Sequence, residues 1–212
     1  MTTSIPSILV IGQGPVAEAI PSRFSADARG VITLARPDAA AIKALENGLD
    51  AAVIVAPPAP SPSLFLDIDD ARLDAQLADF NDLFEALGAL LGRLNPKGAI
   101  VLVGDRGYLG AWGAADACAF SGAYVAMMRC VTLEGFSAGH RANCIALDLA
   151  QDGAGVDPDE IADLAVHLTS PAGQAINGEI ILANRGRSLR VREAKDRRAD
   201  FAASASSKGP SL

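Results

Sequence analysis

Two short stretches of this sequence hold residues whose types and spacing could do chemistry. Gly12 and Gly14 form a G-x-G turn between an apolar run and a helical pattern, where glycines can let the backbone approach a phosphate at a helix N-terminus. A lone G-x-G also marks an ordinary tight turn, and Pro15, which follows it, has no N–H to donate. Farther along, Asp105 and Tyr108 could act as a base and an acid. The alternative there is a loop in which Asp105 pairs with the neighbouring arginine.

Composition limits the class of protein that can carry such sites. The chain has 212 residues, enough for one well-cored domain, which we place at residues 1–190. No apolar run reaches the roughly 18 residues of a membrane span, and the first residues do not form a signal peptide, so we predict a cytoplasmic protein. Its three cysteines have no paired or metal-ligand spacing, and its two histidines, His140 and His167, have no cysteine or carboxylate neighbours; we therefore predict no metal site.

Charge is distributed unevenly along the chain. Residues 1–184 hold 10 Lys and Arg against 22 Asp and Glu, whereas residues 185–212 hold 8 against 3. An acidic body argues against nucleic acid as a partner. Residues 191–212 read as a basic, low-complexity, disordered tail. The alternative is that the tail docks on the body or on a partner subunit.

The elements that must position these residues alternate between short apolar runs and helical patterns. Such alternation is typical of a parallel sheet covered by helices on both faces. The predicted strands are residues 7–12, 31–35, 51–56, 99–104, 142–149 and 179–183. The predicted helices are residues 17–24, 37–46, 74–94, 113–137 and 158–168. We therefore expect an α/β fold with a doubly wound parallel sheet of about six strands.

Over about residues 7–190, the order and spacing of a further set of residues match the pattern of a known protein family. Within residues 127–147, its members are Arg129, Leu133, Glu134, Gly139, Arg141, Asn143 and Ile145. Residues 73–81, 97–101 and 159–180 follow the same family pattern in order. The chain thus resembles the short-chain dehydrogenases/reductases, which implies a Rossmann-like fold. Only 13 residues separate Arg36 from Asp50, so the resemblance implies a truncated fold that lacks one strand.

The resemblance also places unusual residues at the family's catalytic positions. In the family a helix opens with Tyr-x-x-x-Lys, where the tyrosine donates a proton and the lysine lowers its pKa. Ala117 stands at the tyrosine position and Ser121 at the lysine position. Asp105, or with a shift of one residue Gly104, stands where the family has a serine, and Asn81 matches its active-site asparagine. The segment after residue 149 is too short for the family's mobile lid. We therefore expect a degenerate member without the Tyr-x-x-x-Lys motif.

The cofactor positions depart from the family as well. The first loop, with Gly12 and Gly14, is one residue shorter than the family's glycine loop. The family's adenine-binding strand falls in the deleted segment. Arg36 follows the second strand, where it would favour the 2′-phosphate of NADP or would simply be a surface arginine. We expect no ordinary NAD site, and NADP held by Gly12, Gly14 and Arg36 is the alternative.

A chain that has lost the family's catalytic residues can still keep the surfaces through which its subunits pair. Two apolar faces follow the helix at 74–94, one with Leu77, Phe80, Phe84, Leu87, Leu91 and Leu94, the other with Leu83, Ala86 and Leu90. In the family, this helix and the one at 113–137 build a four-helix bundle between subunits. We therefore predict a non-catalytic subunit that pairs with an active NAD(P)-dependent paralogue. The alternatives are an atypical NADP-dependent oxidoreductase and a homodimeric non-redox module or enzyme that uses Asp105 and Tyr108.

Overall fold

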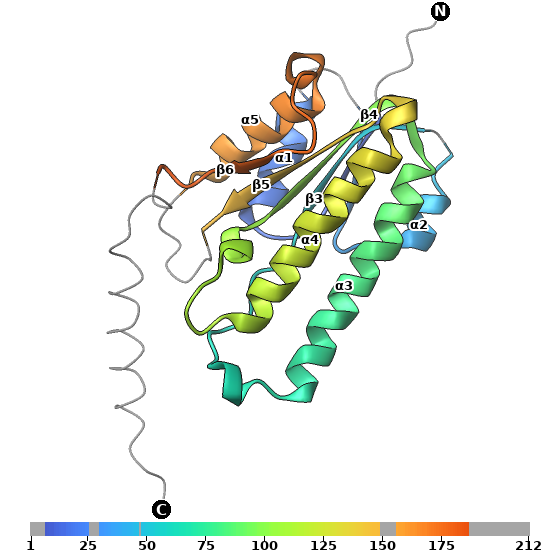
Figure 1. Cartoon of the computed structure of the whole chain (residues 1–212). Helices are drawn as coiled ribbons and strands as arrows, with labels where there is room; N and C mark the ends of the chain where they lie inside the picture. Colours follow the sequence, from blue (N-terminus) through green and yellow to red (C-terminus); the bar gives the residue numbers. More distant parts are fainter. Residues whose placement is uncertain (1–6, 26–29, 47, 149–155, 187–212) are drawn as a thin grey trace, which may run out of the picture.

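Six apolar runs pair into one parallel sheet, as predicted (Figure 1). The computed structural model describes residues 7–25, 30–46, 48–148 and 156–186. The strands are β1 (Ser7–Ile11), β2 (Gly30–Leu34), β3 (Leu49–Val55), β4 (Leu94–Asp105), β5 (Arg141–Leu147) and β6 (Ile180–Leu182). They lie in the order β2-β1-β3-β4-β5-β6, and every pairing is parallel. In the described part of the chain, β2 is the last strand on its side, so the truncated fold expected from the sequence is confirmed.

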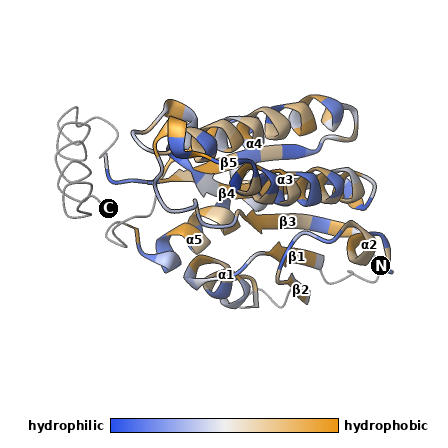
Figure 2. Cartoon of the chain, turned by 90° about the horizontal axis from the view of Figure 1, so that it is seen from below, coloured by the Kyte–Doolittle hydropathy of each residue, from blue (hydrophilic) through white to orange (hydrophobic). Residues whose placement is uncertain are grey.

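The helices cover the sheet on both faces because the strand side chains alternate between two cores. One core joins Leu9 and Ile11 of β1 to α2 (Ala39–Lys43), α3 (Asp70–Leu91) and α4 (Ala115–Glu134). The other joins Ile8 and Val10 to α1 (Pro15–Ser25) and α5 (Pro158–Thr169). Figure 2 shows the hydrophobic strands between these two helical layers. Strands buried on both faces explain the nearly continuous apolar runs of the sequence.

Four short 3-10 turns complete the described structure: η1 (Phe65–Asp67), η2 (Arg106–Leu109), η3 (Phe136–Ala138) and η4 (Pro171–Gly173). The carboxyl ends of all six strands meet at one edge of the sheet, because all pairings are parallel. β1 lies between β2 and β3, so the strand order reverses beside it. In open α/β sheets, ligands bind at the carboxyl edge beside such a reversal.

The bounds of the two long helices differ from the prediction for local reasons. The first helix begins at Asp70 rather than residue 74, because the Asp69 side chain caps it by accepting a hydrogen bond from the Arg72 N–H. It ends at Leu91, and Leu94 already belongs to β4. The second begins at Ala115 rather than residue 113, since Gly113 has a positive φ of 65°. No helix in the described residues is both long and apolar enough to cross a bilayer.

Candidate functional site

A cavity of about 220 Å³ opens at the carboxyl edge of the sheet, between α3 and α4. Asp105, Ala117 and Ser121 all line it, so the structure brings together three of the four residues that the sequence placed at catalytic positions. Asn81 does not join them: its side chain is exposed, and it is not a lining residue. The helical repeat explains this, because Gln76 and Asp79 face the cavity and a residue two positions after Asp79 points to another side of α3.

The Ser121 side chain links α4 to the backbone that follows β4, beside the cavity. Its side chain is buried at 5% exposure. The hydroxyl donates to the Asp105 carbonyl at 3.0 Å and accepts from the Tyr108 N–H at 3.1 Å. Because its one proton is already donated to the backbone, this hydroxyl ties α4 to the end of β4. Ala117, one helical turn earlier, contributes only a buried methyl group.

Asp105 and Tyr108 are arranged differently from the acid–base pair considered above. One Asp105 carboxylate oxygen accepts from the Gly107 N–H at 2.6 Å, so the side chain caps η2. Burial raises the pKa of the Asp105 carboxyl, and the Gly107 hydrogen bond opposes that rise. Tyr108 is not among the residues that line the cavity. The sequence also left open an ion pair between Asp105 and Arg106; in the structure, Arg106 Nε pairs with the Asp148 carboxylate at 2.5 Å.

The phenol in the cavity belongs to Tyr124, which the sequence analysis did not single out. It lies one helical turn after Ser121 and therefore on the same face of α4, a spacing that could have revealed it. Burial, and to a smaller extent the negative charges of Asp79 and Asp105, raises the pKa of Tyr124 to about 12. Tyr124 is consequently a neutral phenol and a weak acid at physiological pH.

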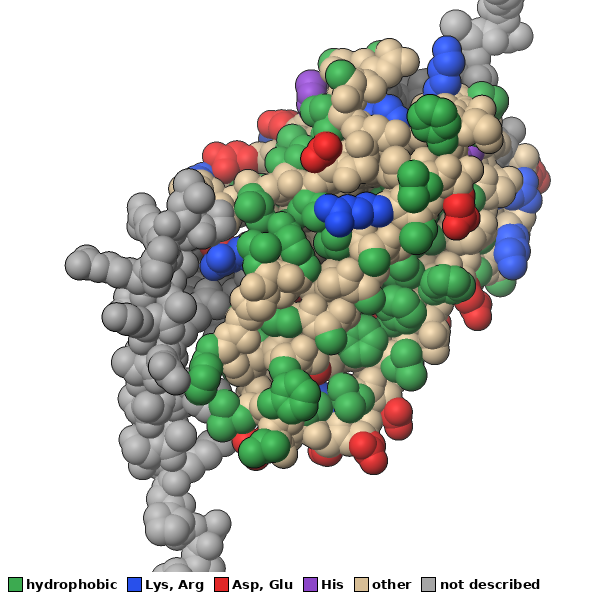
Figure 3. Space-filling model, viewed as in Figure 1, with side chains coloured by type: hydrophobic (Ala, Val, Ile, Leu, Met, Phe, Trp, Pro, Cys, Tyr) green, Lys and Arg blue, Asp and Glu red, His purple; other side chains and the backbone are tan. Residues whose placement is uncertain are grey.

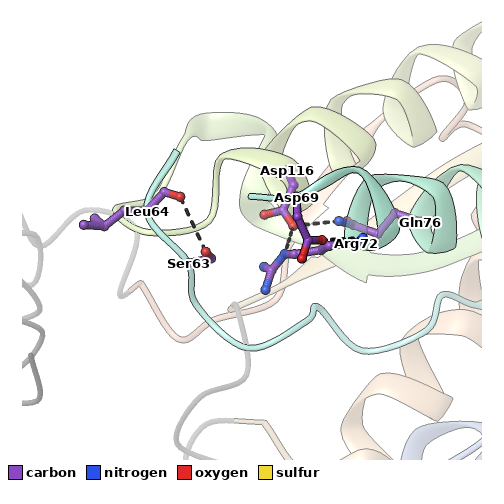
Figure 4. Close-up of polar contacts among 6 residues, drawn as sticks. All are labelled: Ser63, Leu64, Asp69, Arg72, Gln76 and Asp116. Carbon is purple, nitrogen blue, oxygen red and sulfur yellow. Dashed lines mark hydrogen bonds and ion pairs between the residues drawn. The ribbon is translucent and has the colours of Figure 1, made fainter. Parts of the chain in front are cut away.

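Beside the cavity, a polar network joins the first turns of α3 and α4 (Figure 4). The buried Asp116 carboxylate accepts from Arg72 Nε and, at 2.6 Å, from Gln76 Nε2. Burial raises the pKa of Asp116, but the hydrogen bonds from Arg72, the Ala117 N–H and Gln76 outweigh it, so the pKa lies below its usual value. The Arg72 guanidinium, which lines the cavity, is thus already paired with a carboxylate.

A second cavity of about 240 Å³ lies beside the strand reversal and shares Pro57, Pro58 and Asp79 with the first. Gly12 and Arg36, two of the three predicted cofactor residues, line it, whereas Gly14 does not. Glycine is required at position 12 for packing: its φ is 132°, and a Cβ there would lie 2.7 Å from the Val55 carbonyl oxygen. This is the role of an ordinary tight turn between strand and helix.

The residues around the second cavity fit a dinucleotide poorly. Pyrophosphate is held by backbone N–H groups and positive charge at a helix N-terminus. Here Pro15 is the first residue of α1 and has no N–H. Pro57 and Pro58 also lack donors, and the carboxylates of Asp79 and Asp82 line the same space. Among the described side chains that line this cavity, Arg36 is the one cation, and the Gln13 amide is a neutral donor.

An aromatic cluster covers the outer side of α3 and α4. The Phe80 ring lies 6.3 Å from that of Phe84, 6.0 Å from that of Phe120 and 6.1 Å from that of Tyr124. Leu77 and Phe84 remain exposed, at 47% and 62%. Figure 3 shows hydrophobic side chains gathered over these two helices. The predicted second face of α3, with Leu83, Ala86 and Leu90, is buried against the sheet.

No protein-family model matches the sequence, and no curated protein matches it either. Many solved structures do match its fold. An oxidoreductase of the short-chain dehydrogenase/reductase family from Burkholderia thailandensis has a TM-score of 0.72 and 21% identity, covering 93% of this chain and 98% of that one. A putative short-chain dehydrogenase/reductase from Burkholderia xenovorans has a TM-score of 0.73 and 19% identity, covering 87% and 97%. BdcA in complex with NADPH has a TM-score of 0.68 and 15% identity, covering 84% and 92%. The chain therefore has the α/β fold of the short-chain dehydrogenases/reductases.

Proposed function

We propose that this chain is a non-catalytic, degenerate member of the short-chain dehydrogenases/reductases. It pairs through α3 and α4 with an active NAD(P)-dependent chain of the same fold and stabilises or regulates that partner. The observation that carries the proposal is which side chains line the cavity at the carboxyl edge. Where the family resemblance requires a phenol and an ammonium group, the cavity has a buried methyl group and a serine hydroxyl bonded to backbone.

The remaining phenol does not replace the missing donor. A general acid works best when its pKa lies near the working pH, and it contributes about 10²- to 10⁴-fold to a rate. The Tyr124 pKa of about 12 is raised by burial and by two carboxylates, which is opposite to the effect of a neighbouring ammonium group. Among the described residues that line this cavity, the one cation is Arg72, and it is engaged by Asp116.

The outer surface of α3 and α4 supports the pairing part of the proposal. Leu73, Leu77 and Phe84 are large apolar side chains that are 40%, 47% and 62% exposed on one helix. Burying apolar surface contributes about 25 cal/mol per Å², so covering such side chains favours association. Interface cores are enriched in aromatic residues, and the exposed Phe84 ring stacks on the half-buried Phe80 at this surface.

Native mass spectrometry tests the pairing. The full chain is measured alone and after co-expression with an intact short-chain dehydrogenase encoded by the same organism. We expect a heteromeric complex that Leu77→Ser combined with Phe84→Ser weakens at least tenfold. Leu182→Ser is the matched control, because it removes a 40% exposed leucine on β6, away from these helices. If the chain remains a monomer or a homodimer whichever candidate partner is co-expressed, the proposal is contradicted.

A second candidate function is an atypical NADP-dependent oxidoreductase. One observation favours it: Arg36 lines the cavity beside Gly12, where it could face a 2′-phosphate. If this function is correct, Arg36→Ala weakens NADPH binding and leaves NADH binding unchanged. If Arg36→Ala leaves the affinity for NADPH as well as the affinity for NADH unchanged, this second function is excluded.

A further inference from the structure

The two cavities share Pro57, Pro58 and Asp79, and together they are called the groove. Its charged lining comes mainly from α3, with Arg36 and Asp105 from outside that helix. Asp79 lines both cavities and Asp82 lines the second. The two residues are three positions apart on a helix, and like charges at that spacing destabilise it by about 0.2–0.5 kcal/mol. Both side chains are exposed, and neither forms an ion pair with another described residue. Asp105 adds a third carboxyl group at the end of β4.

A second acidic cluster, at the start of α5, is already held in ion pairs. On α5, Asp159 and Asp163 pair with Arg23 at 3.1 and 3.2 Å. Glu160 pairs with Arg185 at 2.9 Å. A basic segment that approaches this edge of the molecule therefore finds unpaired carboxylates in the groove rather than on α5.

Such a segment leaves the described structure at the same edge. The described chain ends at Gly186, after Asn184, which is buried and donates to Asp148 at 3.4 Å. β6 is two strands from β4, and neighbouring strands lie about 4.8 Å apart, so the exit lies about 10 Å from β4 and about 20 Å from β1. An extended chain spans about 3.3 Å per residue, so six or seven residues beyond Gly186 suffice to cross that distance.

The sequence beyond Gly186 has the complementary charge. Residues 187–198 hold six basic side chains, Arg187, Arg190, Arg192, Lys195, Arg197 and Arg198, against Glu193 and Asp196. Most other groove-lining side chains are apolar and can contact the aliphatic stems of Arg and Lys, with Pro57, Pro58 and Phe120 among them.

We propose that residues 187–198 dock in the groove of their own chain, with their basic side chains against Asp79 and Asp82. The segment then occupies the space that a dinucleotide takes at the strand reversal of this fold class. This inference does not depend on pairing with a second chain. Attraction between exposed charges falls with ionic strength, so docking is weaker at 500 mM than at 20 mM salt.

Limited trypsin digestion of the full chain, followed by mass spectrometry, measures how accessible residues 187–198 are. We expect cleavage in this segment to be at least threefold faster in Asp79→Asn combined with Asp82→Asn than in the unchanged chain at 20 mM salt. Glu46→Gln combined with Glu134→Gln is the matched control, since it removes the same charge from exposed positions outside the groove. Equal cleavage rates in all three chains would overturn the proposal.

Zero-length carbodiimide coupling supplies a second readout that does not depend on how a variant folds. On the unchanged chain it should join Lys195 to Asp79 or Asp82. Mixing isotopically light and heavy chains distinguishes coupling within one chain from coupling between copies. Products that join Lys195 only to α5, or only to another copy, would contradict docking in the chain's own groove.

Discussion

Replacing Ser121 with alanine tests whether this residue is structural. In the structure its hydroxyl accepts from the Tyr108 N–H and donates to the Asp105 carbonyl, and the side chain is 5% exposed. Ser121→Ala removes both bonds and leaves a half-buried N–H without its acceptor. A buried group left without a partner costs about 1–3 kcal/mol, so we expect the free energy of unfolding to fall by that amount. In a domain of this size, each kcal/mol lowers Tm by about 2–4 °C.

Urea unfolding followed by circular dichroism measures this loss. Ser137→Ala, at an exposed position in η3, is the matched control and should change stability by less than about 0.5 kcal/mol. A Ser121→Ala variant as stable as the control would refute the reasoning. An intact fold with a large loss of an NAD(P)-linked activity would refute it too, because the hydroxyl would then be catalytic.

The remaining predictions concern the turn, the polar network and the catalytic positions. Gly12→Ala should lower the free energy of unfolding by about 1–3 kcal/mol, because its φ of 132° and a 2.7 Å contact with a backbone oxygen exclude a side chain; thermal unfolding checks this. The pKa of Asp116 is lower in the folded chain than its ordinary value of 3.8, so its contribution to stability is fully present above that value and is lost as pH falls through the folded pKa. Asp116→Asn should flatten the acid limb of a stability–pH curve, and an unchanged limb would contradict the pairing with Arg72. Ala117→Tyr combined with Ser121→Lys should destabilise the chain by overpacking and create no NADPH oxidation, which absorbance at 340 nm follows.

The sequence predicted the sheet well because parallel strands buried on both faces leave a strong signal. Each run of β-branched and aliphatic residues became a strand, and the short interval between Arg36 and Asp50 correctly indicated a missing strand. Helix ends were predicted less well. The Asp69 cap lies outside the apolar periodicity that located α3, and hydrophobic pattern alone does not register a capping side chain.

The candidate site was predicted in part, and the misses have physical causes. Asp105 and Ser121 came together because one ends β4 and the other lies on the helix packed beside it. Asn81 did not, because it lies two positions after the cavity-lining Asp79 and therefore about 200° farther around α3. The ion pair of Arg106 with Asp148, just beyond the end of the neighbouring strand β5, was not predicted, because strand order is not encoded in local sequence.

The most direct test of a non-catalytic site is a titration of the full chain with NADH and NADPH. Energy transfer from Trp112, the single tryptophan, to bound nicotinamide reports binding. A groove lined by Asp79 and Asp82, with no donor at Pro15, predicts no saturable signal for either dinucleotide in the micromolar range. Saturation at micromolar concentration, with oxidation of the reduced cofactor on addition of a carbonyl substrate, would contradict the account.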